Sequence, residues 1–178
     1  MNLIFTGASG FLGTHLKPLF QKVFQVKTMG LMDGDSYKVN LATTIPEIKE
    51  EFDVVLHAAG KAHMVPRTES EKKAFFDVNL QGTVNLCKAF ENTGVPKAFI
   101  FISTVAVYGL EFGENITEKH PLNGDTPYAL SKIQAEEYLT DWCARNNVTL
   151  GIIRPSLIAG PNPPGNLGDM IRGIKTGK

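Results

Sequence analysis

Short apolar runs recur along the chain, and each is bounded by glycine, proline or polar residues. The run at 53–57 is almost continuously apolar, which is typical of a parallel strand that is covered on both faces. Other runs have the length and the β-branched or aromatic content of strands. The predicted strands lie at 2–6, 24–28, 53–57, 97–103 and 148–153, with a weaker one at 37–40.

Helical patterns fill the gaps between these strands. In 69–92 apolar residues recur at mixed spacings of three and four, and Gly94 and Pro96 follow as a normal helix stop. Segment 127–146 has the pattern of a second long helix with many polar positions. Strands that alternate with helices form βαβ units with right-handed crossovers. The sequence therefore predicts an α/β fold, a doubly wound parallel sheet with helices on both faces.

The end of the chain has a different pattern. A cluster of glycine, proline and asparagine at 160–166 predicts that the compact unit ends near residue 160. Residues 167–178 have the pattern of a short amphipathic helix, and the rest of the sequence offers no obvious partner for its apolar face. We therefore divide the chain into a domain at 1–160 and, at 161–178, the start of a second lobe that is cut short.

Composition and charge exclude several classes of protein. Eighteen Lys and Arg residues balance eighteen Asp and Glu residues, which argues against a nucleic-acid binder that needs a basic excess. No apolar run approaches the ~20 residues of a membrane span. The two cysteines and the absence of a signal-peptide pattern suit a reducing compartment, so we expect a cytoplasmic protein. No cluster has zinc-ligand spacing, and we expect no metal.

The first predicted strand runs directly into a glycine-rich turn that opens a helix. Gly7 can supply the tight turn, Gly10 lets the backbone approach a pyrophosphate, and Gly13 lets helix and strand pack closely. The helix then offers free amides and its positive dipole end to the phosphates. This placement predicts a dinucleotide site of the Rossmann type, and an ordinary glycine-tolerant turn is the alternative.

The choice between NAD and NADP stays open in the sequence. The acid that would hold the adenosine ribose is not evident, because Asp33 and Asp35 lie slightly too far beyond the second strand. We interpret both as turn residues. No arginine stands in their place to hold a 2′-phosphate, so NAD is favoured.

Three side chains form a candidate catalytic group. Tyr128 and Lys132 are four residues apart, which places them on one face of a helix. A nearby ammonium favours the phenolate, so we expect Lys132 to lower the pKa of Tyr128 and make it an acid or base for an alcohol hydroxyl. Ser103 and Thr104 end a strand at the carboxyl edge, where ligands bind in such sheets. Thr104 could bind the same hydroxyl, or it could cap a loop.

Together these features resemble the extended short-chain dehydrogenase/reductase family, in its nucleotide-sugar epimerase/dehydratase branch. The resemblance runs from residue 1 to about residue 165 and rests on seven motifs in order. They are T-G-x-x-G-x-x-G at 6–13, N-L at 40–41 in place of D-L, H-x-A-[AG] at 57–60, V-N-x-x-G-T at 78–83, S-[ST]-x-x-V-Y-G at 103–109, P-Y-x-x-S-K at 127–132, and R-P-x-x-x-x-G-P at 154–161.

The resemblance implies a set of site residues. The catalytic residues would be Thr104, Tyr128 and Lys132. The cofactor-binding residues would be Gly7, Ser9, Gly10, Phe11, Leu12, Gly13, Asn40, Leu41, Ala58, Ala59, Gly60, Ser103, Tyr128, Lys132 and Pro155. At position 40 the asparagine keeps an acceptor for adenine but loses the charge of the usual aspartate.

The resemblance also implies an activity. The 4,6-dehydratases of this branch carry an Asp-Glu pair after the catalytic threonine, whereas this chain has Val105 and Ala106, which cannot transfer protons. That favours an NAD(P)-dependent nucleotide-sugar 4-epimerase. The alternatives are an NAD(P)H-dependent reductase of a keto-sugar or of a non-sugar carbonyl, and a non-catalytic dinucleotide sensor.

Substrate and partners follow from the same resemblance. A nucleotide sugar would be bound largely by a C-terminal substrate lobe, most of which is absent from this chain. A homodimer would form through the helices at 69–92 and 127–146.

Overall fold

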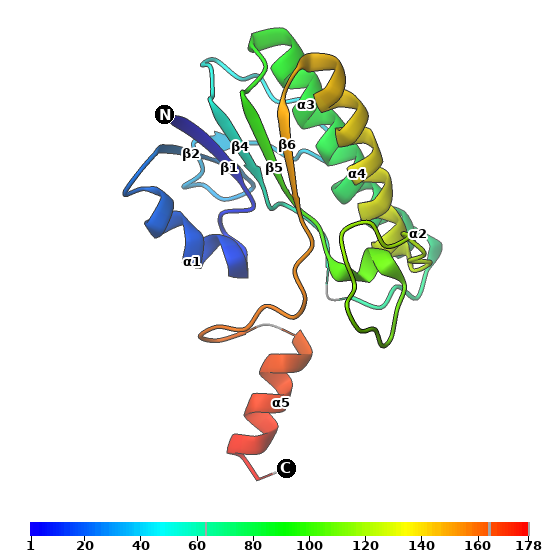
Figure 1. The fold of residues 1–178 in the computed structure, drawn as a ribbon. Helices are drawn as coiled ribbons and strands as arrows, with labels where there is room; N and C mark the ends of the chain where they lie inside the picture. Colours follow the sequence, from blue (N-terminus) through cyan, green and yellow to red (C-terminus); the bar gives the residue numbers. More distant parts are fainter. Residues whose placement is uncertain (63, 164, 178) are drawn as a thin grey trace.

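The computed structural model describes residues 1–62, 64–163 and 165–177. Its centre is a six-stranded sheet in the order β3-β2-β1-β4-β5-β6, with every neighbouring pair parallel (Figure 1). The order reverses between β1 and β4, and in such sheets the carboxyl ends at this point bind ligands. The strands are β1 (Asn2–Thr6), β2 (Gln25–Gly30), β3 (Tyr37–Lys38), β4 (Val54–His57), β5 (Ala98–Ile102) and β6 (Thr149–Ile153).

Helices cover both faces of the sheet, as a doubly wound fold requires. Helix α1 lies on one face, and α3 and α4 lie side by side on the other (Figure 1). The helical segments are α1 (Phe11–Phe20), α2 (Glu69–Phe76), a π-helical turn (Asp77–Gln81), α3 (Gly82–Thr93), a 3-10 helix (Val105–Tyr108), α4 (Pro127–Asn146) and α5 (Gly165–Lys175).

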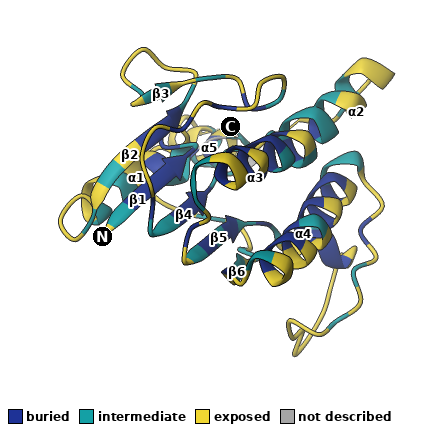
Figure 2. Cartoon of the chain, turned by 90° about the horizontal axis from the view of Figure 1, so that it is seen from above, coloured by how far each residue is buried: buried dark blue, intermediate teal, exposed yellow. Residues whose placement is uncertain are grey.

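Alternation along the strands explains the two layers of core. In β1, Leu3 and Phe5 pack with the side chains of α1, whereas Ile4 between them packs with those of α3 and α4. The central strands β1, β4 and β5 and the facing sides of α3 and α4 are accordingly the most buried parts (Figure 2). Trp142 of α4 is fully buried, and its indole nitrogen donates to Glu91 at 2.8 Å. Each large apolar side chain buried in this way contributes about 1.5–3 kcal/mol.

Several predicted elements have different limits in the structure. The second strand begins at Gln25 and extends to Gly30, and the weak strand is only Tyr37–Lys38. The helix predicted at 69–92 is interrupted by the π-helical turn at Asp77–Gln81. That turn lets the side chain of Asn79 point inward, where it binds Lys61 and Ser131. Helix α4 has the limits predicted for it.

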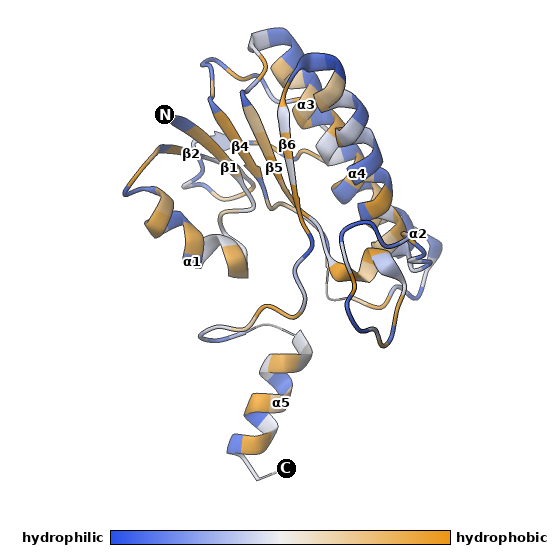
Figure 3. Ribbon diagram, viewed as in Figure 1, coloured by the Kyte–Doolittle hydropathy of each residue, from blue (hydrophilic) through white to orange (hydrophobic). Residues whose placement is uncertain are grey.

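The C-terminal segment lies apart from the sheet. Helix α5 sits beyond the carboxyl edge of the strands, at the end of the segment that follows β6 (Figure 1). Its apolar and polar residues alternate along the helix (Figure 3). The division of the chain at residue 160 stays a prediction, and Pro164 and Lys178 lie outside the described residues. Within the described ranges, no helix has both the length and the apolar character needed to cross a membrane.

Candidate active site

The glycine-rich turn between β1 and α1 is packed tightly against the turn that follows β4. Gly7 has a φ of +75°, and a Cβ there would lie 2.5 Å from the amide nitrogen of Ala59. A Cβ on Gly13 would lie 2.6 Å from the Cα of Ala8. Only glycine fits at these two positions, because the neighbouring atoms are backbone and cannot swing aside. Ser9 and Gly10 are exposed, so the outer side of the turn is open to a ligand.

The first turn of α1 leaves its amides free. Gly10 is the N-cap and has no side chain to bond them, and no acidic residue lies in the first turn. The first intrahelical bond runs from Thr14 to Gly10 at 2.9 Å, so the amides of Phe11, Leu12 and Gly13 have no intrahelical acceptor. Free amides at the positive end of a helix dipole fit a diphosphate.

The segments after β4 and β6 form the walls around this turn. Thr6 accepts a hydrogen bond from the amide of Ala59 at 3.2 Å, which holds the turn at 58–60 against β1. A Cβ on Gly60 would lie 3.3 Å from the Nζ of Lys132, so this turn passes beside the candidate catalytic lysine. After β6, a Cβ on Gly160 would lie 3.2 Å from the ring of Phe11. The predicted residues at 7–13 and 58–60 therefore lie beside one another at the carboxyl edge of the sheet.

Asn40 and Leu41 follow β3 and have their side chains engaged within the chain. The Oδ1 of Asn40 accepts from the amide of Ala42 at 3.1 Å. Leu41 is buried in the core, and its carbonyl accepts from Asn85 at 2.7 Å. Their proposed contact with adenine stays a prediction. Asp35 folds back on its own turn and accepts from the amide of Met32 at 3.0 Å.

The three candidate catalytic residues lie together where β5 ends and α4 begins. Thr126 caps α4 by accepting from Ala129 at 3.1 Å, and this fixes the helix start that carries Tyr128. Thr104 caps the 3-10 helix after β5 by accepting from Ala106 at 3.2 Å. The side chain of Thr104 also lies close enough to the phenol of Tyr128 to affect its pKa.

Lys132 is a buried cation. Only 4% of the residue is exposed, and its Nζ donates to the carbonyl of Ile102 at 2.8 Å and lies 4.4 Å from the ring centre of Phe101. Burial lowers the pKa of Lys132 to about 8, and the carboxylate of Glu136 opposes that shift. The ammonium is therefore close to losing its proton under mildly alkaline conditions.

The pKa of Tyr128 departs from the prediction. Burial raises the pKa of Tyr128 above the usual value, and the nearby Thr104 hydroxyl opposes this rise only in part. The predicted lowering by Lys132 is not found, because the ammonium points to Ile102 and Phe101 while the phenol packs beside Phe75, with ring centres 6.0 Å apart. A phenolate at this position needs a further partner for its charge.

Two buried polar side chains, His57 and Asn79, hydrogen-bond to the residues that form the site. His57 bonds to Thr6 at 2.6 Å and to Thr83 at 3.0 Å, and burial together with the charge of Lys132 lowers its pKa to about 3. Asn79 accepts from the amide of Lys61 at 2.7 Å and donates to Ser131 at 2.9 Å. We interpret His57 as a neutral strand-end residue and Asn79 as a brace between the cofactor-side turn and α4.

Sequence reasoning missed a buried ion pair beside the site. The pattern of α4 assigns Glu136 to a solvated face, and this is wrong: Glu136 is 2% exposed and binds Arg154 with a shortest distance of 2.6 Å. The hydroxyl of Ser103 also donates to Glu136, so this predicted cofactor residue points its side chain into the protein. The usable signal was the spacing, since Glu136 lies one turn beyond Lys132 on the same face.

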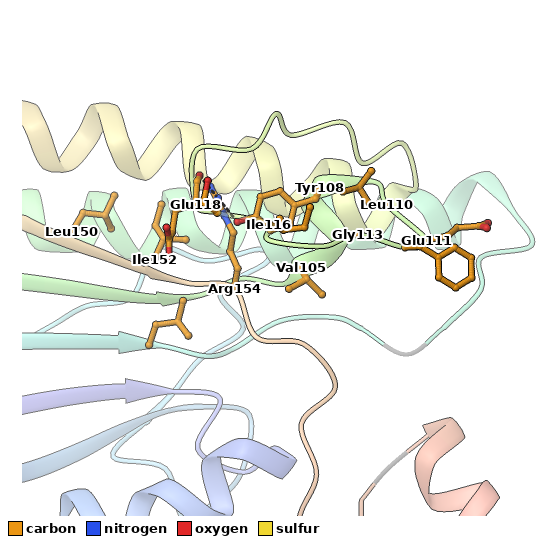
Figure 4. Close-up of a pocket in the computed structure, with 13 residues that line it drawn as sticks. Val105, Tyr108, Leu110, Glu111, Gly113, Ile116, Glu118, Leu150, Ile152 and Arg154 are labelled. Carbon is orange, nitrogen blue, oxygen red and sulfur yellow. Dashed lines mark hydrogen bonds between the residues drawn. The ribbon is translucent and has the colours of Figure 1, made fainter.

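A cavity of about 830 Å³ opens between β6 and the loop that follows the 3-10 helix (Figure 4). Val105, Tyr108 and Arg154 are among its lining residues, but Thr104 and Tyr128 are not. The cavity therefore adjoins the candidate catalytic group without containing it. Among the described residues, no group of three or more His, Cys, Asp or Glu side chains is placed to hold a metal ion.

Comparison with known proteins places the chain in a family. Residues 3–178 match the family model described as "NAD dependent epimerase/dehydratase family". The chain is 37% identical over 99% of its length to N-acetyl-alpha-D-glucosaminyl-diphospho-ditrans,octacis-undecaprenol 4-epimerase of Escherichia coli O157:H7. It is 31% identical over 99% of its length to UDP-glucose 4-epimerase of Vibrio cholerae.

A solved structure supports the same assignment. The UDP-glucose 4-epimerase of Thermus thermophilus, crystallised with NAD, aligns with a TM-score of 0.78 and 25% identity, covering 97% of this chain and 61% of that one. The chain spans 55% and 57% of the two curated relatives. The six-stranded parallel sheet, the glycine turn and the match over residues 3–178 agree. The chain belongs to the NAD dependent epimerase/dehydratase family.

Proposed function

We propose that this protein is an NAD-dependent 4-epimerase of diphosphate-linked sugars. One observation carries the proposal: Thr104, Tyr128 and the buried Lys132 gather where β5 ends and α4 begins, at the edge of the sheet where α1 leaves its amides free. A proton-transfer group beside a site that suits a dinucleotide diphosphate supports this activity. The family membership and the 4-epimerases among the relatives support the same activity.

The residues around the glycine turn fit the cofactor. Gly10 leaves the turn open toward a diphosphate, and Gly7 and Gly13 let the turn pack closely. The first amides of α1 would bind the diphosphate, and the turn at 58–60 would lie beside it. We propose NAD rather than NADP because Asp35, and no arginine, lies beside Gly30 at the end of β2. A bound nicotinamide would supply the hydride acceptor and donor that epimerisation of a sugar carbinol requires.

Tyr128 and Thr104 act on the sugar hydroxyl. Thr104 holds the hydroxyl oxygen, and Tyr128 removes its proton as hydride leaves the same carbon and returns the proton afterwards. Lys132, one turn along α4 from Tyr128, supplies the positive charge that a phenolate at Tyr128 needs. Val105 and Ala106 carry no carboxyl groups, so these positions offer no acid or base for dehydration.

The substrate class is a hexose or N-acetylhexosamine joined to a diphosphate. The two curated relatives differ in what carries that diphosphate, an undecaprenol in one name and UDP in the other. We propose a nucleotide carrier, a cytoplasmic location and a homodimer that pairs the α2–α3 segment and α4 of each copy.

The test is incubation of the purified protein with NAD and one sugar donor at a time. The donors are UDP-glucose, UDP-N-acetylglucosamine and undecaprenyl-diphospho-N-acetylglucosamine, and the products are separated chromatographically. Formation of the 4-epimer without net NADH supports the proposal, and only the UDP donors should react. Reaction of the undecaprenyl donor alone would contradict the proposed nucleotide carrier. In a separate incubation with NAD(P)H and a 4-keto sugar, net consumption of NAD(P)H would show a reductase instead.

A further inference from the structure

A buried ion pair lies directly behind the candidate catalytic residues. The carboxylate of Glu136 accepts from the Nε and Nη2 of Arg154, at 3.2 and 2.6 Å, and from the hydroxyl of Ser103. Glu136 is 2% exposed and Arg154 is half-buried. Desolvation of such a pair offsets much of its attraction, and apolar replacements are often as stable. Stability alone therefore does not account for it.

The ion pair joins the ends of two strands to α4. Ser103 follows the last residue of β5 and precedes Thr104, and Arg154 follows the last residue of β6 and precedes Pro155. The backbone continues the link, because the amide of Ser103 donates to the carbonyl of Ile153 at 2.7 Å. The three bonded side chains thus fix where the polypeptide turns away from both strands.

Lys132 adds a second attachment one helical turn away. Its Nζ binds the carbonyl of Ile102, while Glu136 binds the side chain of the next residue, Ser103. Two points on α4 therefore hold two consecutive residues of the chain, and Thr104 comes immediately after them. Because Tyr128 is one turn before Lys132 on the same helix, this attachment fixes the distance between Thr104 and Tyr128.

The remaining donors of Arg154 extend the attachment toward the cavity. Its Nη1 donates to the hydroxyl of Tyr108 and to the carbonyl of Glu118, both at 3.0 Å (Figure 4). Glu118 belongs to the loop that connects the 3-10 helix to α4. Arg154 therefore binds both the last residue of the 3-10 helix and the loop that follows it.

We propose that Glu136 is a positioning residue, which through Ser103 and Arg154 fixes the position of Thr104 relative to Tyr128. This inference rests on the proposed function, in which Thr104 and Tyr128 bind the reacting hydroxyl. Glu136 does not touch that hydroxyl and acts only through the residues it holds. Its negative charge also favours the protonated form of Lys132, one turn away.

The central variant is Glu136→Gln, which keeps the size and one carbonyl acceptor but removes the charge. Its matched control is Glu137→Gln, which removes the same charge from the adjacent, exposed position. We expect Glu136→Gln to lower kcat on the order of 10- to 100-fold, because small misplacements of reacting groups have effects of this size. The KM for the sugar donor and the affinity for NAD should match those of Glu137→Gln, since the diphosphate site lies on α1.

Amide hydrogen exchange tests the attachment without any turnover. Glu136→Gln should accelerate exchange at Ser103 and Val105, whose amides bond to Ile153 and Pro155, and leave the amide of Gly13 unchanged. Equal kcat in the two variants would overturn the proposal, as would parallel loss of NAD affinity and kcat. If the wild-type protein epimerises no donor, the proposed function fails. Unchanged exchange at Ser103 and Val105 in Glu136→Gln would contradict the proposed attachment as well.

Discussion

The packing of the glycine turn predicts opposite outcomes for the same substitution at two glycines. Gly13 and Gly82 are both buried, and both lie in the first turn of a helix. A Cβ at position 13 would meet the backbone of Ala8 at 2.6 Å, whereas a Cβ at position 82 would meet the Cβ of Leu41 at 3.5 Å, an ordinary contact. Gly13→Ala therefore overpacks a rigid turn, and Gly82→Ala fills available space.

The magnitudes follow from the two environments. Alanine gains about 1 kcal/mol over glycine in a helix, and this gain is common to both variants. Overpacking against atoms that cannot move aside costs about 1–3 kcal/mol. The free energies of unfolding of the two variants should thus differ by about 1–3 kcal/mol. In a protein of this size each kcal/mol corresponds to about 2–4 °C in Tm.

The assays are thermal denaturation and calorimetric titration with NAD. Gly82→Ala should have a slightly raised Tm and an unchanged Kd for NAD. Gly13→Ala should have a lower Tm than Gly82→Ala and should bind NAD at least about tenfold more weakly, a change of about 1.4 kcal/mol, because the displaced turn moves the amides of α1. Equal Tm and equal Kd in both variants would show that the turn is not closely packed and that its amides do not hold the diphosphate.

Three further predictions concern the polar residues of the site. Tyr128→Phe should abolish epimerisation in the turnover assay while the Kd for NAD stays nearly unchanged, and retained turnover would exclude Tyr128 as the acid or base. Lys132→Met should raise the free energy of unfolding at pH 7 by up to about 3 kcal/mol in urea denaturation, because the fall in the pKa of Lys132 from 10.5 to about 8 measures what burial of the charge costs. That gain should shrink as the pH rises from 8 toward 10.5, where the wild-type lysine no longer protonates on unfolding, and a destabilised Lys132→Met at pH 7 would contradict it. The pKa of His57 is lowered from 6.5 to about 3, so the unfolded chain binds a proton in this window that the folded chain does not, and stability should fall as the pH drops through it. His57→Gln should flatten this dependence, and an unchanged slope would exclude His57 as its source.

The sequence pattern predicts the layered fold because each strand alternates between two covered faces. Leu3, Ile4 and Phe5 illustrate this, since their alternation already separates the two core clusters. The π-helical turn at Asp77–Gln81 was not predicted, because it changes the direction of Asn79 without disturbing the apolar spacing around it. Local pattern therefore defines where elements occur, and tertiary contacts decide where one of them is distorted.

The site residues divide in the same way. Glycine spacing and the Tyr128–Lys132 interval are local, and the structure has both the closely packed glycine turn and the helix that carries Tyr128 and Lys132. The burial of Glu136 depends on Arg154, which lies in a different element. The interval of four from Lys132 is a local sign that the two share a helix face, but it does not reveal the partner. The raised pKa of Tyr128 likewise reflects burial beside Phe75 of α2, which the spacing on α4 does not contain.

The candidate site combines two features that oppose folding. The amides of α1 lack a capping side chain, and the ammonium of Lys132 is desolvated. A ligand with a diphosphate and ribose hydroxyls would bond the amides and give Lys132 new acceptors, so its binding would relieve both of these features at once. Features unfavourable to folding that one ligand can relieve are expected at functional sites. Their convergence at the strand-order reversal and along the neighbouring β5–α4 edge therefore favours a dinucleotide site over an accidental cleft.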